Sequence, residues 1–222
     1  MNSKFRTTEI SNPEYECNNL RFITVKTPNL KGRGDVCVFV PPFQNIKDIP
    51  IVTLLHGVYG SAWIWSQKAG VHLTALKMME QGLIKPMVIA MPSDGLWGDG
   101  SAYLPHHNYN FESWIVNDVI DVVRENISCV SNKSDLFIAG LSMGGYGALR
   151  LGVKYHDIYN AISGHSSLTN TNQMHLFVEE KESDYFKNME VEKDLFELMK
   201  RNKEMLPSIR FDCGKADLLI AY

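Results

Sequence analysis

The four cysteines of this 222-residue chain form no metal-binding or redox motif. Cys17, Cys37, Cys129 and Cys213 lie far apart, and none belongs to a CxxC pair. Zinc sites and thiol-redox motifs need closely spaced cysteines. The sequence therefore predicts free thiols, as is usual in a reducing compartment, and no metal site.

Basic side chains form no cluster, and the net charge is −3 at pH 7. A nucleic-acid footprint requires a basic patch or stripe, so we expect no nucleic-acid partner. No apolar run approaches the ~20 residues of a membrane-spanning helix. Residues 1–7 also lack the apolar core of a signal peptide. These absences predict a cytoplasmic protein that does not associate with membranes.

Nothing in the sequence marks a domain boundary, because it has no Pro/Gly/Ser-rich linker, low-complexity tract or internal repeat. With 45% hydrophobic and 21% charged residues, the chain is long enough for one sizeable core. We therefore expect a single domain over residues 1–222. The oligomeric state stays open, a homo-oligomer included.

What the chain does contain is a Gly-x-Ser-x-Gly motif from Gly140 to Gly144, placed between an apolar run and a segment of helical periodicity. A serine on such a strand-to-helix turn is exposed for attack, and the glycines let strand and helix approach closely. The first N–H groups of the helix have no helical partner and can bind an oxyanion. We predict that Ser142 is a nucleophile and that the Met143 N–H is an oxyanion donor.

The rest of the chain alternates between strand-like and helix-like segments, which favours an α/β fold. The buried-strand patterns are residues 51–55, 86–92, 135–140 and 158–163, and the helical patterns are residues 67–81 and 110–126. Residues 19–40 are typical of two antiparallel strands. We expect a mostly parallel central sheet with helices on both faces. A helical, cap-like insertion is expected at residues 168–206, with Val191 and Leu195 on one helix face.

The segment His56-Gly57-Val58-Tyr59-Gly60 follows the first buried strand. In serine-hydrolase sheets a glycine-flanked loop at this place supplies the second oxyanion donor, so the Val58 N–H is our candidate. His56 could be a catalytic base, but a histidine ahead of a glycine turn more readily hydrogen-bonds the loop in place. We therefore interpret His56 as structural.

Four further residues are expected to contact a substrate. Gly57 and Tyr59 flank Val58, and Trp97 lies in a loop after the strand at residues 86–92. His165 follows the predicted strand at residues 158–163, and open parallel sheets bind ligands at the carboxyl ends of their strands.

Two acidic residues and a histidine pair could indicate other chemistry. Asp94 and Asp99 could form a metal site or a glycosidase pair, but no His/Glu spacing accompanies them, and we expect them to form turns. His106 and His107 are adjacent, so they converge poorly on one metal ion.

The predicted strand at residues 208–213 leads into Gly214-Lys215-Ala216-Asp217. Where a triad runs Ser, acid, His along the chain, the acid follows a late core strand. Asp217 fits that position, and Asp212, within the strand, is the alternative. No histidine follows Asp217.

Together the motifs at residues 54–60, 140–148 and 214–217 resemble the esterase family that includes esterase D, the S-formylglutathione hydrolases, bacterial tributyrin esterases and, more distantly, the mycolyltransferases. The likeness covers most of the chain from about residue 20 and is greatest to the small tributyrin-type esterases. It implies an α/β-hydrolase fold and hydrolysis of short-chain acyl esters, or of thioesters such as S-formylglutathione, without a cofactor. It also implies Ser142 as nucleophile, Asp217 as triad acid, and Val58 and Met143 as oxyanion donors.

The sequence departs from this family where the triad histidine should follow one further helix and strand, a unit of roughly 30 residues. We therefore expect that this C-terminal unit is missing, that the chain is truncated after residue 222, and that its activity is impaired or absent. Two alternatives stay open: a base supplied by His165 or a partner subunit, and a non-catalytic relative that binds acyl ligands. An acyltransferase of the same fold is a further possibility.

Overall fold

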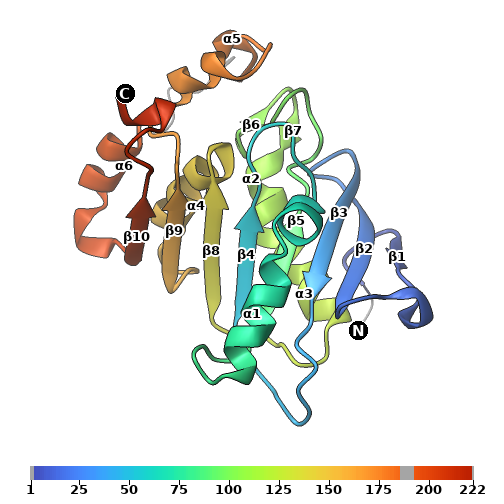
Figure 1. Ribbon diagram of the computed structural model, residues 1–222. Coiled ribbons are helices and arrows are strands. Elements are labelled where there is room, and N and C mark those ends of the chain that lie inside the picture. Colours follow the sequence, from blue (N-terminus) through green and yellow to red (C-terminus); the bar gives the residue numbers. More distant parts are fainter. Residues whose placement is uncertain (1–2, 186–192, 222) are drawn as a thin grey trace.

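An eight-stranded sheet forms the centre of the protein (Figure 1) in the computed structural model, which describes residues 3–185 and 193–221. The strands, in their order across the sheet, are β1 (Thr8–Ile10), β2 (Leu20–Thr27), β3 (Gly32–Phe39), β5 (Val88–Pro92), β4 (Ile51–Leu55), β8 (Leu136–Leu141), β9 (Ala161–His165) and β10 (Ser208–Asp212). Pairing from β1 through β3 to β5 is antiparallel, and from β5 onward it is parallel. The predicted mostly parallel sheet with antiparallel N-terminal strands is confirmed.

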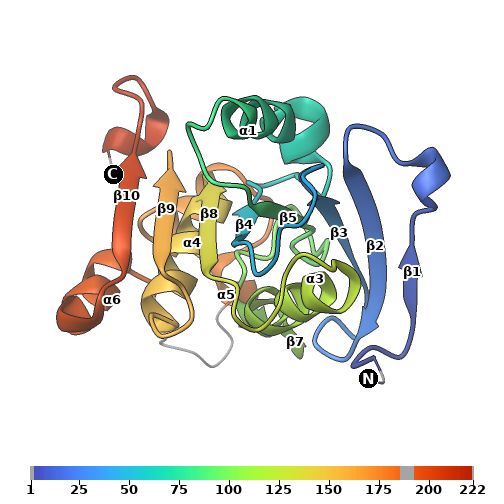
Figure 2. The ribbon, with the colours of Figure 1, turned by 90° about the horizontal axis from the view of Figure 1, so that it is seen from below.

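Helices lie on both faces of this sheet, as predicted (Figure 2). The α-helices of the described residues are α1 (Val71–Glu80), α2 (Phe111–Ser113), α3 (Ile120–Asn126), α4 (Met143–Lys154), α5 (Glu182–Tyr185) and α6 (Leu195–Arg201). A π-helical segment at Trp114–Val119 joins α2 to α3, another at Ile64–Lys68 precedes α1, and a small hairpin comprises β6 (Pro105–His106) and β7 (Tyr109–Asn110). Helix α1 lies on one face, and α3 and α4 lie on the other. The predicted start near Asn110 is confirmed, because its side chain accepts from the Ser113 N–H at 2.8 Å.

The alternation of side chains along β3 shows how the sheet divides the core. Val36 and Val38 pack with the α3 and α4 side, whereas Cys37 and Phe39 pack with Ala75 and Met79 of α1. Both faces of this strand are buried because helices cover it on each side.

Strand β9 begins later than the predicted residues 158–163. The N–H groups of Ile158 and Tyr159 both donate to the Tyr155 carbonyl, at 2.9 and 3.3 Å. These two apolar residues therefore close the C-terminal turn of α4, and the strand starts only at Ala161. An apolar run alone does not distinguish a helix end from a strand start.

The cap segment, residues 168–206, lies between β9 and β10 and contains α5, α6 and a 3₁₀ turn at Thr171–Leu176. Leu195 and Leu198 are buried, and α6 packs against α4. Val191, predicted on the same helix face, lies outside the described residues. Within the described ranges no helix is both long and apolar enough to cross a membrane.

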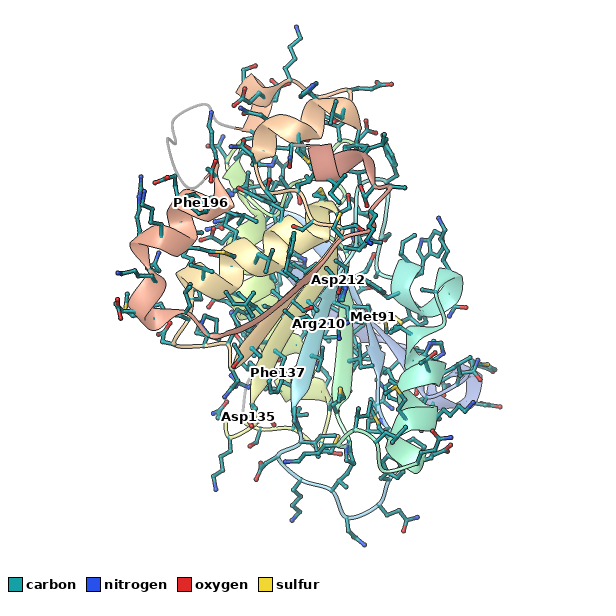
Figure 3. All side chains as sticks on the ribbon, turned by 60° about the vertical axis from the view of Figure 1, so that its left-hand side comes forward. Met91, Asp135, Phe137, Phe196, Arg210 and Asp212 are labelled. Carbon is teal, nitrogen blue, oxygen red and sulfur yellow. The ribbon has the colours of Figure 1, made fainter. Side chains whose placement is uncertain are left out.

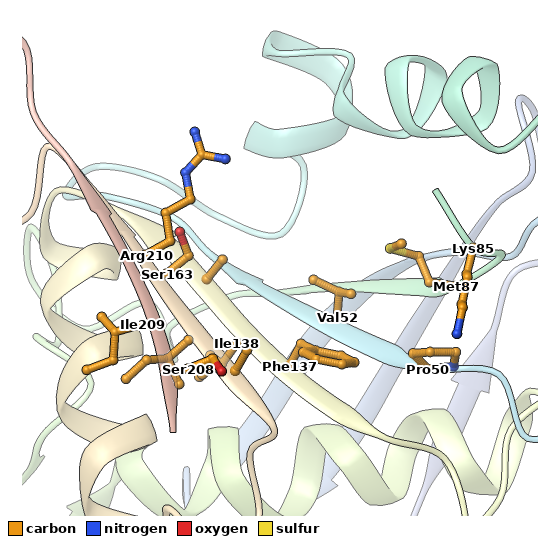
Figure 4. A pocket seen from close by; sticks show the side chains of 13 residues that line it. Pro50, Val52, Lys85, Met87, Phe137, Ile138, Ser163, Ser208, Ile209 and Arg210 are labelled. Atoms are coloured by element: carbon orange, nitrogen blue, oxygen red, sulfur yellow. The ribbon is translucent and has the colours of Figure 1, made fainter. Parts of the chain in front are cut away.

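The α1 face of the sheet is only partly covered. Beside α1, an apolar groove of ≈ 490 Å³ runs across β4, β8, β9 and β10 (Figure 4). Val52, Phe137 and Arg210 are among its lining residues. Strand β10 is exposed along its whole length at the edge of the sheet.

Candidate active site

Ser142 occupies the sharp turn between β8 and α4, in a strained backbone conformation of φ 56° and ψ −119°. Two glycines make this turn possible. A Cβ on Gly140 would lie 2.0 Å from the Gly144 carbonyl oxygen, and a Cβ on Gly144 would lie 2.3 Å from the Leu55 carbonyl oxygen. Because neither position has room for a side chain, the motif is required for strand, turn and helix to meet. Positive φ at a non-glycine residue is costly and concentrates at functional sites.

The Ser142 backbone is tied to both neighbouring segments. Its N–H donates to the His165 carbonyl at 2.9 Å, and its carbonyl accepts from the Tyr146 N–H at 3.0 Å. The side chain is partly exposed, and among the described residues its hydroxyl has no hydrogen-bond partner. A Cβ on Gly57 would lie 3.9 Å from Ser142 Oγ. The loop after β4 therefore lies directly beside this hydroxyl.

The two predicted oxyanion donors, Val58 and Met143, directly follow Gly57 and Ser142, the two residues that meet here. Met143 is the first residue of α4, so its N–H has no partner within the helix. Among the described residues neither N–H donates to another backbone or side-chain acceptor. Neither N–H is therefore occupied by a described acceptor, as the predicted role of oxyanion donor requires.

His56 is buried and holds the loop, as the sequence predicted. Its Nε2 accepts from the Asp94 N–H at 3.1 Å, so the ring proton lies on Nδ1, which donates to the Gly57 carbonyl at 2.7 Å. That carbonyl and the Val58 N–H belong to one planar trans peptide and point in opposite directions. By fixing the carbonyl, the imidazole fixes the direction of the Val58 N–H.

Asp94 and Asp99 have different roles, although both were predicted to form turns. Asp94 accepts from the N–H groups of Leu96 and Ser101 at 2.9 and 2.6 Å, which confirms its turn role. Asp99 also lies in a turn, at residues 98–99, as predicted, but its carboxylate accepts from the Glu179 N–H in the cap segment, at 2.9 Å. The local sequence of a loop cannot reveal an acceptor used by a distant segment.

Asp217 follows β10 at the same end of the sheet as Ser142. Its carboxylate accepts from the Leu219 N–H at 2.9 Å, and this bond, with one from the Ser166 hydroxyl, lowers the pKa of Asp217. Ser166 directly follows His165, whose carbonyl binds the Ser142 N–H. Asp217 is therefore bonded to the residue that follows His165, the partner of the Ser142 N–H.

His165 and Asp212 form a pair on the partly covered face. His165 Nδ1 lies 2.9 Å from Asp212 Oδ2, and this hydrogen bond lowers the pKa of Asp212. His165 Nε2 lies 3.3 Å from Ser163 Oγ, so both ring nitrogens are engaged away from Ser142. Asp212 projects from β10 near Arg210 (Figure 3). Among the described residues no histidine hydrogen-bonds to the Ser142 hydroxyl.

Trp97 and Tyr59, predicted to bind substrate, lie in different surroundings. Tyr59 is 66% exposed. Trp97 packs its ring against His106, His107 and Tyr185, with ring centroids 4.4, 5.4 and 5.3 Å away. The cluster joins the loop after β5 to α5 of the cap segment. Within the described residues no group of three or more His, Cys, Asp or Glu side chains is arranged for a metal ion.

The sequence did not predict a buried ion pair between Arg150, in the helix that follows the elbow, and Glu112. Arg150 of α4 is 1% exposed, binds Glu112 and donates to the Tyr103 carbonyl at 3.2 Å. Burial opposes ionisation of Glu112, but Arg150, Tyr155 and Lys154 together hold its pKa below the usual value. The one signal in the sequence is a charged residue on the otherwise apolar face of the helix.

Comparisons with known proteins agree with this geometry. A family model named Esterase, described as "Putative esterase", matches residues 27–206. An acetyl esterase of Caldicellulosiruptor saccharolyticus is 26% identical over 219 residues, which cover 90% of this chain and 75% of that protein.

Among solved structures, the substrate-bound fluorophosphonate-binding serine hydrolase F of Staphylococcus aureus has a TM-score of 0.74 at 21% identity, covering 90% of this chain and 80% of that one. The S-formylglutathione hydrolase FrmB of the same organism has a TM-score of 0.73 at 18% identity, covering 96% and 83%. These likenesses show the α/β-hydrolase fold. Because the family model spans well over half of the chain, the protein belongs to this esterase family.

Proposed function

We propose that the protein is a serine carboxylic-ester hydrolase that acts through an acyl-enzyme on Ser142. The observation that carries this proposal is the strained elbow, which exposes the Ser142 hydroxyl between a glycine loop and a helix N-terminus. The Ser142 hydroxyl gives its proton to a base as its oxygen attacks the ester carbonyl carbon, and the N–H groups of Val58 and Met143 bind the oxyanion. The alcohol leaves with that proton, and water then releases the acid and restores the hydroxyl. Asp217 is the proposed triad acid.

The proposed substrates are short-chain acyl esters, or thioesters such as S-formylglutathione. The printed names of the similar proteins, acetyl esterase and S-formylglutathione hydrolase, support this class. Gly57, Tyr59, Trp97 and His165 stay proposed substrate contacts. We also propose a cytoplasmic location, which the four free cysteines support.

No described side chain is placed to act as the base in this mechanism. Proton transfer requires a group within hydrogen-bonding reach of the Ser142 hydroxyl. No described histidine meets that condition, because His56 holds its loop and His165 binds Asp212. We infer that acylation without such a base is slow, with the oxyanion donors and substrate binding supplying the remaining acceleration.

Hydrolysis of p-nitrophenyl acetate and butyrate by the wild-type protein and by Ser142→Ala tests this function. We expect measurable turnover that the substitution removes. Ser131→Ala is the control, since Ser131 lies in the loop before β8, at the opposite end of that strand from Ser142. Hydrolysis that persists in Ser142→Ala, or is absent from the wild type, contradicts the enzyme proposal.

A non-catalytic acyl-ligand-binding role is the second candidate, and the lack of a described histidine at Ser142 favours it. Such a protein would bind a short-chain ester saturably in calorimetry without consuming it. An acyltransferase would be distinguished by product formed on an added alcohol in preference to water.

A further inference from the structure

The loop at residues 99–102, called here the bridge loop, lies beside one of the two proposed oxyanion donors. The Asp99 carbonyl accepts from the Tyr59 N–H at 2.8 Å. Tyr59 directly follows Val58 and has a left-handed φ of 60°. This bond therefore fixes the strained end of the peptide segment that carries the Val58 N–H.

The same loop also contacts the residue that carries the second donor. The Ala102 N–H points at Met143 Sδ, 3.3 Å away. A Cβ on Gly100 would lie 2.5 Å from Met143 Sδ and 3.5 Å from Val58 Cγ1. The bridge loop therefore packs against the side chains of both Val58 and Met143.

Three hydrogen bonds from the cap segment hold the bridge loop from its other side. The Glu179 N–H donates to Asp99 Oδ2 at 2.9 Å, and the Asp99 N–H donates to Glu180 Oε1 at 3.1 Å. The Tyr185 hydroxyl donates to the Gly100 carbonyl at 2.9 Å. Asp99 is therefore bonded through its N–H, its carboxylate and its carbonyl at once.

The close approach of Glu180 to Asp99 leaves one oxygen of the Glu180 carboxylate in an unfavourable environment. Its Oε2 is buried and, among the described residues, has no hydrogen-bond partner. A Cβ on Gly98, which has a φ of +53°, would lie 2.0 Å from Oε1. Burying a carboxylate oxygen without a partner is unfavourable, so the contact with Asp99 persists because the surrounding packing enforces it.

We propose that the cap segment positions the oxyanion hole through the bridge loop, with Asp99 and Glu180 as positioning residues. The inference rests on the proposed function, since it assigns Val58 and Met143 as donors. Neither positioning residue touches the reacting atoms. Their effect is to hold two N–H groups at a fixed separation, and oxyanion stabilisation depends on donors that are in place before the reaction.

Two pairs of variants test this inference by kinetics. Glu180→Ala and Asp99→Ala remove the side-chain acceptors, whereas Glu180→Gln and Asp99→Asn each keep a carbonyl oxygen in the same place. We expect kcat on p-nitrophenyl butyrate to fall about 10- to 100-fold in the alanine variants and less than about threefold in the amide variants. KM should change little, and the affinity for a boronic acid that mimics the tetrahedral adduct should fall with kcat. Equal losses in Ala and amide variants would overturn the proposal.

Amide hydrogen exchange tests the same inference without any turnover. In Glu180→Ala the Tyr59 N–H should exchange at least about tenfold faster than in Glu180→Gln, with strand β5 unchanged. Unchanged exchange at Tyr59, or a uniform increase across the chain, contradicts a positioning role. Absence of Ser142-dependent turnover in the wild type would refute the proposed function, while the exchange experiment would still decide whether the cap segment holds this loop.

Discussion

The elbow at residues 140–144 and the bridge loop at residues 99–102 meet at the same site but are held in place by different means. The elbow depends on two glycines whose absent side chains let β8, α4 and the end of β4 come together. The bridge loop depends on hydrogen bonds to residues about 40 positions earlier and 80 later in the chain. A steric requirement within five residues forms a recognisable motif, whereas a set of distant partners does not.

This difference predicts how each region fails. Changes in the elbow should produce backbone clashes, which cannot be relieved by a rotamer change and therefore affect the whole fold. Changes in the bridge loop should remove single hydrogen bonds and leave the fold intact while catalysis suffers.

The largest effect is expected from Gly144→Ala. The new Cβ would lie 2.3 Å from the Leu55 carbonyl and 2.5 Å from the His56 carbonyl, both main-chain atoms. We expect a loss of about 3 kcal/mol or more in the free energy of unfolding, or failure to fold. Urea unfolding measures it, with Gly214→Ala as control, because the nearest atom to a Cβ there is 4.0 Å away. A fully stable Gly144→Ala protein would remove the steric argument for the elbow.

Arg150→Met should rank next. Among the described residues it leaves the buried Glu112 carboxylate with Lys154 and Tyr155 as partners, and unpairing a buried ion pair costs about 3–5 kcal/mol. We expect a loss near the lower end of this range in urea unfolding. The double variant Glu112→Leu/Arg150→Met should lose less than the sum of the two single changes. Additive losses would show that the two side chains are not coupled.

His56→Phe should alter catalysis more than stability, because an aromatic ring still fills the buried site while both hydrogen bonds are lost. The Gly57–Val58 peptide then becomes free to rotate, and we expect kcat to fall about 100-fold. Circular dichroism checks that the fold persists. Unchanged kcat would mean that the imidazole does not orient the Val58 N–H.

The smallest expected effect is a dependence of the free energy of unfolding on pH that His106, bonded to Ser101 of the bridge loop, produces. Burial lowers the pKa of His106 to about 4, although its Nε2 donates to the Ser101 carbonyl at 3.0 Å. Between pH 6.5 and 4 the unfolded chain binds the extra proton, so stability falls as the pH is lowered through this window. The wild type should lose roughly 2 kcal/mol more than His106→Asn over this range.

Thermal unfolding at pH 6.5, 5 and 4 measures this difference. The control is His107→Asn, which changes the adjacent ring in the same aromatic cluster. Identical pH profiles for wild type and His106→Asn would show that His106 does not carry this dependence.

Several elements were predictable because their causes are local. Residues 51–55 form β4 as predicted, since a short apolar run buried on both faces is a pattern of one segment. Asn110 caps its helix, and Gly140 leaves room for the Gly144 carbonyl, for reasons confined to a few residues. The predicted start of β9 was wrong because the residues after α4 and the first residues of β9 have the same apolar pattern.

The sequence by itself determined the elbow, the order of strands and helices, and the resemblance to an esterase family. Only the tertiary structure decided the partners that Asp99, His165 and Arg150 have in Glu180, Asp212 and Glu112. The physical reason is that each of these pairs joins segments about 40 to 80 residues apart. Which polar groups meet depends on which strands become neighbours and on how residues 168–206 fold between β9 and β10, and the residues around any one pair determine neither.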